Sequence, residues 1–273
     1  VFDKSLGIIL SFGFLISIVG LIDDKFHLNT GGKLSLQIFP IIYLIIFENF
    51  NLSHLGDYSY FKLTLGTFAI PFTLFAVLLL INAFNYFDGI DGTLSFTTIS
   101  ILAILIFLIK NQNLELFLII IVIPLLVFLC FNFSFFKLPK LFLGDNGSLL
   151  LGFIISFVLI YLANEKLVHP ILLAWSVVIF VYEFLAINLI RLLNNQNPFK
   201  AGQDHLHHLL YNKTNSVLIT NLIISLMNII FFTLGYFIFL IMNSLCSFIL
   251  FISLFIIFLI FRYKYSVKIK VKN

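Results

Sequence analysis

The chain has 273 residues, of which 61% are hydrophobic and only 10% are charged. A soluble domain carries about 25% charged residues, so this composition excludes a soluble globular enzyme and indicates a membrane protein. At about 20 residues per crossing, no stretch is left for a separate soluble catalytic domain, and any chemistry must lie in short loops. The net charge of +4 gives no reason to expect a nucleic-acid partner, because basic residues in membrane proteins follow topology.

Polar interruptions divide the chain into nine apolar segments. They cover residues 5–22, 34–50, 67–84, 94–110, 114–135, 147–163, 168–190, 217–240 and 244–262. We predict an all-α, polytopic transmembrane helical bundle of about nine helices. It forms a single integral membrane domain over residues 1–273 that ends in a basic cytoplasmic tail at 263–273. Since the chain begins at Val1 without a signal-peptide pattern, we expect that its natural N-terminus is missing.

If all nine segments cross the membrane, 12 of the 16 Lys and Arg residues fall on one side and 4 on the other. The positive-inside rule assigns the basic side to the cytoplasm. The loops on that side also gather six Asp and three His. These residues are Asp23, Asp24, Asp88, Asp91, Asp145, Asp204, His205, His207 and His208. We expect them to form one composite site on the cytoplasmic face.

The first polar motif, Gly-Leu-Ile-Asp-Asp, places Asp23 and Asp24 at the end of the first apolar segment. Adjacent carboxylates repel each other unless a cation neutralises them, and their hard oxygen atoms suit Mg²⁺. For this pair alone, a helix end entering water is the better interpretation. Lys33 begins the next segment, where a Lys is usually an interfacial anchor.

The second motif, Asn-Tyr-Phe-Asp-Gly-Ile-Asp-Gly, contains Asn85, Asp88 and Asp91. Each Asp precedes a Gly, which lets the backbone approach a ligand closely. Asp-Gly is also a common turn dipeptide, so a simple interhelical turn is the alternative. So many polar residues at the end of a membrane helix favour a functional site over a simple turn.

The third motif, Phe-Leu-Gly-Asp-Asn-Gly-Ser, places Phe142 and Asp145 just before a helix. Asp145 is either a helix cap or a metal ligand near backbone N–H groups that attract phosphate. Phe142 is either an interfacial anchor or a platform on which a base stacks.

The fourth motif lies in the longest loop and contains Lys200 and the segment His-Leu-His-His at His205, His207 and His208. No Cys or Glu accompanies the histidines at the spacing of a zinc hydrolase, so an anion-recognising cluster is the better interpretation.

The order of these four motifs, over about 20–215, resembles the polyprenyl-phosphate N-acetylhexosamine-1-phosphate transferases, which form glycosyltransferase family 4. The His-Leu-His-His segment is similar to the bacterial branch that transfers N-acetylglucosamine 1-phosphate for O-antigen lipopolysaccharide, enterobacterial common antigen or cell-wall teichoic acid linkage. The branch that transfers phospho-N-acetylmuramoyl-pentapeptide typically has three successive His, whereas Leu206 interrupts them here.

The resemblance implies Mg²⁺-dependent attack of undecaprenyl phosphate on a UDP-N-acetylhexosamine, which releases UMP, with Mn²⁺ as an alternative metal. It implies a multi-pass protein of the bacterial inner membrane, of about eleven helices at full length, and it leaves a homodimer open. Gln203 and Asp204 stand where an Asp-Arg pair is common in the family.

The resemblance also implies roles for individual residues. Asp145 would be the Mg²⁺ ligand and Phe142 would stack on uracil. Asp23 and Asp24 would lie near the metal and the lipid phosphate, and Asp23 would keep that phosphate deprotonated. The nucleotide and sugar-diphosphate contacts would come from Asn85, Asp88, Asp91, Lys200, His205, His207 and His208, with Lys33 as a further candidate.

An ion-coupled transporter is the main alternative from another class, since polar groups along membrane helices can form an ion pathway. A transporter would place acids near the membrane midplane. Among the acidic residues, only Glu183 lies deep inside an apolar segment near the midplane, whereas six Asp residues gather at one interface. A structural scaffold would not need six interfacial Asp, so the sequence favours an enzyme.

Overall fold

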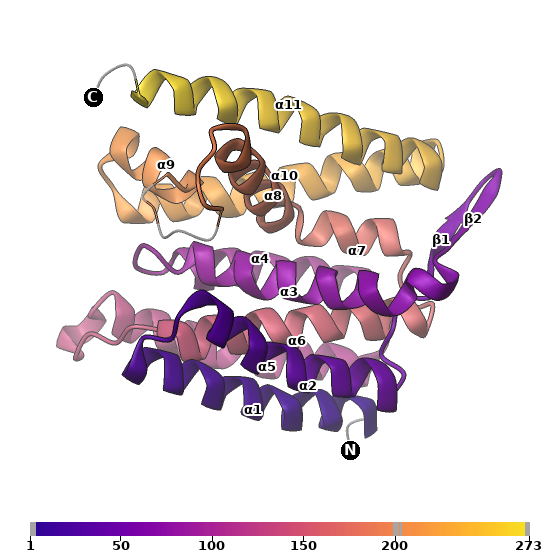
Figure 1. The fold of residues 1–273 in the computed structure, drawn as a ribbon, viewed down its shortest axis with the longest axis horizontal. Helices are drawn as coiled ribbons and strands as arrows, with labels where there is room; N and C mark the ends of the chain where they lie inside the picture. Colours follow the sequence, from indigo (N-terminus) through magenta and orange to yellow (C-terminus); the bar gives the residue numbers. More distant parts are fainter. Residues whose placement is uncertain (1–3, 199–201, 203, 271–273) are drawn as a thin grey trace.

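The computed structural model describes residues 4–198, 202 and 204–270, with side chains omitted at Thr30, Phe136 and 265–270. Its described part is a bundle of α-helices with one two-stranded sheet (Figure 1). The elements are α1 (Lys4–Phe26), α2 (Thr30–Phe47), β1 (His54–Tyr58), β2 (Phe61–Thr64), η1 (Gly66–Phe68), α3 (Ala69–Phe87), α4 (Thr93–Leu108), α5 (Gln112–Asn132), η2 (Phe135–Lys137), α6 (Gly144–Asn164), α7 (Pro170–Ser176), α8 (Val178–Leu193), α9 (Leu206–Thr214), α10 (Val217–Ile241) and α11 (Ser244–Lys270).

The helices confirm the predicted all-α polytopic architecture. In the described residues, six helices are long and apolar enough to cross a membrane, and the bent pair α7 and α8 would make a seventh span. The helices α2 and α4 are shorter but also apolar. Each of the nine predicted segments therefore corresponds to a helix or to this bent pair. Residues 263–270, which we expected in a basic tail, continue α11.

The seventh segment is not one straight helix, because α7 and α8 meet at Val177 with a bend of 74°. The bend leaves backbone groups unpaired within the segment, and Asn228 on α10 satisfies two of them. Its side chain donates to the carbonyl of Ser176 at 3.0 Å and accepts from the N–H of Ile179 at 3.4 Å. A buried polar side chain thus stabilises the break, as membrane interiors require.

The helix α6 lies at the centre of one half of the bundle, packed against α1 and α3. It is the most buried of the candidate spans, with 72% of its apolar window inside the protein. Gly20 permits the close approach of α1 to the start of α6, since a Cβ there would collide with the backbone of Asn146. This contact brings the last turn of α1 beside the first turn of α6.

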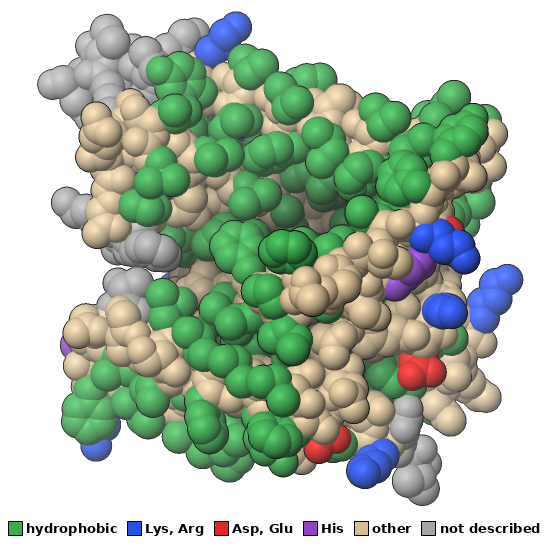
Figure 2. Space-filling model, turned by 45° about the vertical axis from the view of Figure 1, so that its right-hand side comes forward, with side chains coloured by type: hydrophobic (Ala, Val, Ile, Leu, Met, Phe, Trp, Pro, Cys, Tyr) green, Lys and Arg blue, Asp and Glu red, His purple; other side chains and the backbone are tan. Residues whose placement is uncertain are grey.

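Charged side chains lie toward the margins of the face shown in Figure 2, and hydrophobic side chains cover its broad middle. A surface of this kind suits contact with lipid hydrocarbon. The two ends of the bundle carry different structural elements. The antiparallel hairpin β1–β2, with Tyr58 opposite Phe61, projects at one end (Figure 1). At the other end lie the α3–α4 turn, the segment before α6, and α9.

Candidate active site

The acidic end of α1 meets the N-terminus of α6. Asp24 Oδ1 accepts a hydrogen bond from the N–H of Asp145 at 3.0 Å, and Asp24 Oδ2 accepts from the N–H of Asn146 at 3.3 Å. The first N–H groups of a helix have no partner inside it, and an acid from elsewhere can accept from them. Leu143, at the N-cap of α6, makes no side-chain capping bond, so Asp24 supplies this function. The first and third motifs are thereby joined.

The ammonium group of Lys33 lies between two of the predicted site carboxylates. Its Nζ is 2.8 Å from Asp23 Oδ2 and 2.5 Å from Asp145 Oδ2. It also donates to Asn85 Oδ1 at 3.4 Å, while the amide of Asn85 donates to Asp145 Oδ1 at 2.7 Å. Lys33 is therefore not a simple anchor that reaches toward water. It holds three motifs together and compensates the charge of two acids.

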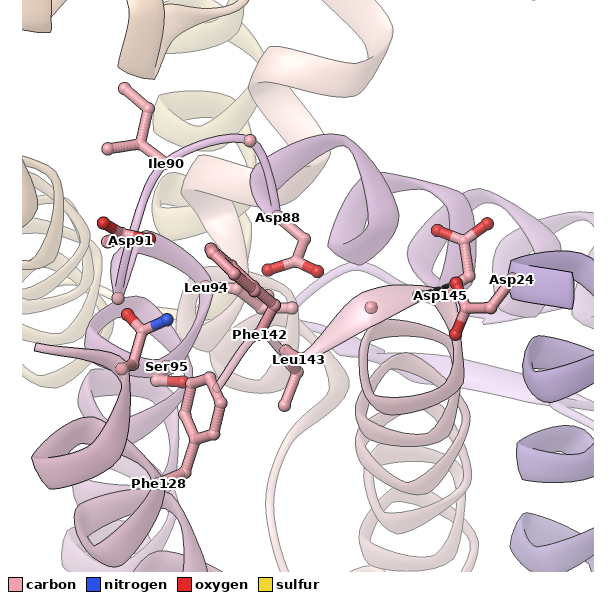
Figure 3. Close-up of a pocket in the computed structure, with 14 residues that line it drawn as sticks. Asp24, Asp88, Ile90, Asp91, Leu94, Ser95, Phe128, Phe142, Leu143 and Asp145 are labelled. Atoms are coloured by element: carbon pink, nitrogen blue, oxygen red, sulfur yellow. Dashed lines mark hydrogen bonds between the residues drawn. The ribbon is translucent and has the colours of Figure 1, made fainter. Parts of the chain in front are cut away.

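Asp88 follows the last residue of α3 and points into a cavity of about 300 Å³, which we call the aspartate cavity (Figure 3). Its lining includes Asp24, Asp88, Asp91, Phe142 and Asp145. The pKa of Asp88 is raised to about 7, first by burial and then by the neighbouring charges of Asp145, Asp24 and Asp91. The cavity thus concentrates more negative charge than its own walls neutralise, which favours a bound cation.

Phe142 lies at the rim of the aspartate cavity with 72% of its surface exposed. The ammonium of Lys140 is 5.1 Å from the centre of the Phe142 ring and 2.6 Å from Asp91 Oδ2. An exposed aromatic face beside a cation is suited to stacking on a planar base and to binding its phosphates.

Two polar residues of the aspartate cavity escaped the sequence analysis. Asn132 ends α5 and Ser95 lies in the first turn of α4, and both are buried. Asn132 Oδ1 and Ser95 Oγ have no hydrogen-bond partner among the described residues. Buried polar atoms without a partner are costly, so a hydrogen bond to either atom would stabilise the site. For Asn132, the signal in the sequence that could have found it was a single Asn near the end of an apolar segment.

The histidines of the fourth motif line a second cavity of about 340 Å³, which we call the histidine cavity. It shares Asp88 and Gly89 with the aspartate cavity and also reaches Asp23, Lys33 and Asn85. Gly89 is required at this junction, because a Cβ there would collide with the ring of His207. The two cavities therefore adjoin at the α3–α4 turn.

The three histidine rings cluster at the start of α9, where those of His205 and His207 are stacked and that of His208 is tilted. The centres of the His205 and His207 rings are 5.6 Å apart with an interplanar angle of 8°, and those of His207 and His208 are 4.3 Å apart. Burial lowers the pKa of His205 to about 4 and also lowers the pKa of His207 and of His208. Without a ligand these rings are neutral at pH 7 and can act as hydrogen-bonding groups. A bound anion would raise their pKa and favour the protonated, cationic form.

Asp204 lines neither of the two cavities and pairs with Arg191. The guanidinium of Arg191 donates to both carboxylate oxygens, at 2.6 Å and 3.1 Å, and to the carbonyl of Pro198 at 2.8 Å. Asp204 is thus a structural member of the loop. Lys200, the remaining predicted site residue, lies outside the described residues.

No group of three or more His, Cys, Asp or Glu in the described part of the chain is arranged to hold a metal ion alone. A Mg²⁺ ion beside phosphates typically uses only one or two protein carboxylates, together with substrate oxygens and water. Asp145, Asp24 and Asp88 supply hard oxygen donors, and the pKa of Asp88 is raised first by burial and then by repulsion from the neighbouring acids. The carboxylates present are therefore oxygen donors of the kind that Mg²⁺ prefers.

A family model described as glycosyl transferase family 4 matches residues 6–163, which include the first three motifs. The chain belongs to this family. Among its relatives, an undecaprenyl-phosphate alpha-N-acetylglucosaminyl 1-phosphate transferase of Escherichia coli O157:H7 is 30% identical over 199 residues, covering 70% of this chain and 54% of the relative.

The enzymes of the same name from Yersinia pestis and Haemophilus influenzae give similar results. The first is 30% identical over 203 residues and the second 29% identical over 205 residues. Each match covers 72% of this family 4 chain, and 56% and 58% of the relative respectively. The chain therefore spans little more than half the length of these curated relatives.

Proposed function

We propose that this protein transfers N-acetylglucosamine 1-phosphate from a UDP-sugar to undecaprenyl phosphate and releases UMP. The observation that carries the proposal is the meeting of four sequence motifs, far apart in the chain, at two adjoining cavities on one end of an apolar bundle. Family membership and the names of the relatives support sugar-phosphate transfer to undecaprenyl phosphate.

The aspartate cavity suits the uridine nucleotide. Phe142 offers an exposed ring for stacking, and the unpartnered atoms of Asn132 and Ser95 can hydrogen-bond to a base or a ribose. Lys140 lies next to the Phe142 ring and can pair with a phosphate, provided that it leaves Asp91. The nucleotide would then place its diphosphate over the junction at Asp88 and Gly89.

The histidine cavity suits the lipid phosphate and the sugar-linked phosphate. Lys33 and Asn85 can bind phosphate oxygens there, and the neutral rings of His205 and His207 can donate hydrogen bonds. Asp23 accepts from Lys33 and from the N–H of Leu28, which fixes its position beside this cavity. Both phosphates would be held within reach of each other, and positioning supplies much of the acceleration in phosphoryl transfer.

In the reaction, an oxygen of undecaprenyl phosphate attacks the phosphorus that bears the sugar. A new bond forms between that oxygen and the phosphorus. The bond from the phosphorus to the bridging oxygen breaks, and its electrons leave with UMP. A phosphate monoester has a second pKa near 6, so the nucleophile is already largely ionised at neutral pH. Asp23 keeps it so and need not act as a strong base.

A Mg²⁺ ion held by Asp145 would neutralise charge on the diphosphate and on the departing phosphate. Lys33, which now compensates Asp23 and Asp145, would be released toward a phosphate oxygen. Asp24 keeps the first turn of α6 in place through its two backbone hydrogen bonds. Mn²⁺ has similar ligand preferences and is an alternative.

The excess of basic residues on the motif side supports a cytoplasmic site, where UDP-sugars are found. An ion-coupled transporter receives less support, because Glu183, the acid that lies deep inside an apolar segment, forms an ion pair with Arg262. Within the described residues, this acid is buried with a partner and is therefore not free to carry an ion across the midplane.

The donor can be tested in bacterial membranes that contain the full-length protein. We expect radiolabelled N-acetylglucosamine 1-phosphate to enter lipid from UDP-N-acetylglucosamine only when undecaprenyl phosphate and Mg²⁺ are present. UDP-N-acetylmuramoyl-pentapeptide and other UDP-N-acetylhexosamines serve as competing donors. Preferred transfer of the muramoyl-pentapeptide would assign the protein to that branch, and no lipid product from any donor would refute the proposal.

A further inference from the structure

The start of α9 is held by an ion pair that is buried inside the bundle. Glu183 on α8 and Arg262 on α11 are 1% and 3% exposed. The guanidinium donates to both carboxylate oxygens, from Nε to Oε2 at 2.9 Å and from Nη2 to Oε1 at 2.7 Å. Such a pair carries a large desolvation cost and is weak evidence for stability, so its other contacts are the better guide to its role.

Both members of the pair also bind the backbone on either side of His205. Glu183 Oε1 accepts from the N–H of Leu206 at 2.8 Å, and Arg262 Nη2 donates to the carbonyl of Asp204 at 2.7 Å. These bonds fix the two peptide groups that flank His205. They leave little freedom for the direction in which its side chain leaves the backbone.

Glu183 also supplies the cap that α9 lacks. His205 is the N-cap residue of α9, and its side chain makes no capping hydrogen bond. The ring of His205 is therefore free to line the histidine cavity, because an acid from another helix accepts from the first N–H of α9. The same turn carries His207, whose ring touches the position of Gly89.

We propose that Glu183 and Arg262 are positioning residues that orient His205 and His207 toward the junction of the two cavities. The role of the oriented histidines in catalysis rests on the proposed function. The orientation itself can be tested without any transferase activity. Through Arg262, the last helix of the chain becomes part of the support of the site.

Histidine accessibility tests the orientation directly. In the full-length protein, diethylpyrocarbonate labelling of each His can be followed by mass spectrometry. His205 and His207 are 7% and 1% exposed and should label slowly, whereas His54, with a side chain 36% exposed at the opposite end, is an internal reference. In Glu183→Gln and in Arg262→Met, the labelling of His205 and His207 relative to His54 should rise on the order of tenfold, because hydrogen bonds to charged groups are lost.

Tyr182→Phe is the matched control. Tyr182 is the neighbour of Glu183, is fully buried, and donates to the carbonyl of Phe251, so this variant also removes an α8–α11 contact. It leaves the α9 contacts intact, and the labelling of His205 and His207 should match the wild type. Unchanged labelling in Glu183→Gln, or an equal rise in Tyr182→Phe, would overturn the proposal.

The charge-swapped double variant Glu183→Arg with Arg262→Glu separates positioning from a purely structural ion pair. It restores opposite charges on α8 and α11, but it presents a cation to the Leu206 N–H and an acid to the Asp204 carbonyl. We expect the thermal stability to recover relative to the single variants, while the labelling of His205 stays high and kcat stays on the order of tenfold low. Recovery of wild-type labelling by the swap would show that the pair is only structural. If no transferase activity is found in the wild type, the labelling still decides the orientation.

Discussion

The carboxylate of Asp24, at the end of α1, caps the helix in which Asp145 forms the first turn, with 3.0 Å between Asp24 Oδ1 and the backbone nitrogen of Asp145. Asp24 therefore has a structural effect that can be measured without substrates. We expect Asp24→Ala to lower the free energy of unfolding by about 1 kcal/mol, and Asp24→Asn to lower it less, because an amide oxygen still accepts. Thermal unfolding in detergent measures this. Asp57→Ala, at an exposed acid of the opposite end, should change stability little, and equal losses in Asp24→Ala and Asp57→Ala would contradict the capping role.

Asp88 makes the stability of the metal-free protein depend on pH. Burial raises its pKa to about 7 from an ordinary value of 3.8, with the charges of Asp145, Asp24 and Asp91 as further causes. A carboxyl with a raised pKa contributes stability that is complete below the unfolded pKa and is lost as the pH rises through the folded pKa. Asp88→Asn should therefore gain stability relative to the wild type between about pH 4 and 7, with a constant difference above.

Mg²⁺ should oppose this effect, because a cation favours the charged form of Asp88. Thermal unfolding of the wild type and Asp88→Asn, each with and without Mg²⁺ across this pH range, checks both statements. A stability difference that does not vary with pH would show that Asp88 titrates normally.

Gly89 separates the two cavities and allows no side chain beside His207. We expect Gly89→Ala to displace the His207 ring and to lower kcat about a hundredfold, since misplacement of about 1 Å at a reacting group has an effect of that order. Gly7→Ala is the control, because a Cβ at Gly7 meets no atom within 4 Å. That variant should keep full activity, and an active Gly89→Ala would mean that His207 is not needed where the structure places it.

Phe142 should determine nucleotide affinity through its exposed face. We expect Phe142→Ala to raise the Kd for UMP about tenfold, and Phe142→Trp to keep it near the wild-type value, because stacking on a base contributes about 1–3 kcal/mol. Isothermal titration calorimetry measures both. Phe68→Ala, at a residue 71% exposed in η1, is the control for loss of an exposed ring. If the two Ala variants bind UMP equally well, Phe142 does not stack on the base.

The positions of the membrane helices could be predicted from the sequence because apolar length is a local property. The bend at Val177 could not, because no Pro or Gly marks it and the residue that stabilises it, Asn228, comes from α10. The hairpin β1–β2 also escaped prediction, since its strands are only five and four residues long.

For the site, too, some features could be predicted from the sequence and others could not. The grouping of the motifs followed from topology and from the sorting of charges. The partners could not be derived: Lys33 looked like an anchor, and Glu183 looked like a single acid, until Asp145 and Arg262 were placed beside them. Asn132 and Ser95 were missed because each belongs to an apolar helix and becomes notable only as an unpartnered atom in a cavity.

We propose above all that the acids of the first three motifs, together with the histidines of the fourth, transfer a sugar phosphate to a lipid phosphate. The most direct measurement is the rate of UMP release from UDP-N-acetylglucosamine in membranes that contain undecaprenyl phosphate and Mg²⁺, for the wild type, Asp88→Asn, Asp145→Asn and the control Asp57→Asn. We predict that UMP release by Asp88→Asn and Asp145→Asn falls at least about a hundredfold while Asp57→Asn keeps the wild-type rate, because only the first two remove charge that phosphate transfer requires. Wild-type rates in Asp88→Asn and Asp145→Asn would contradict the account.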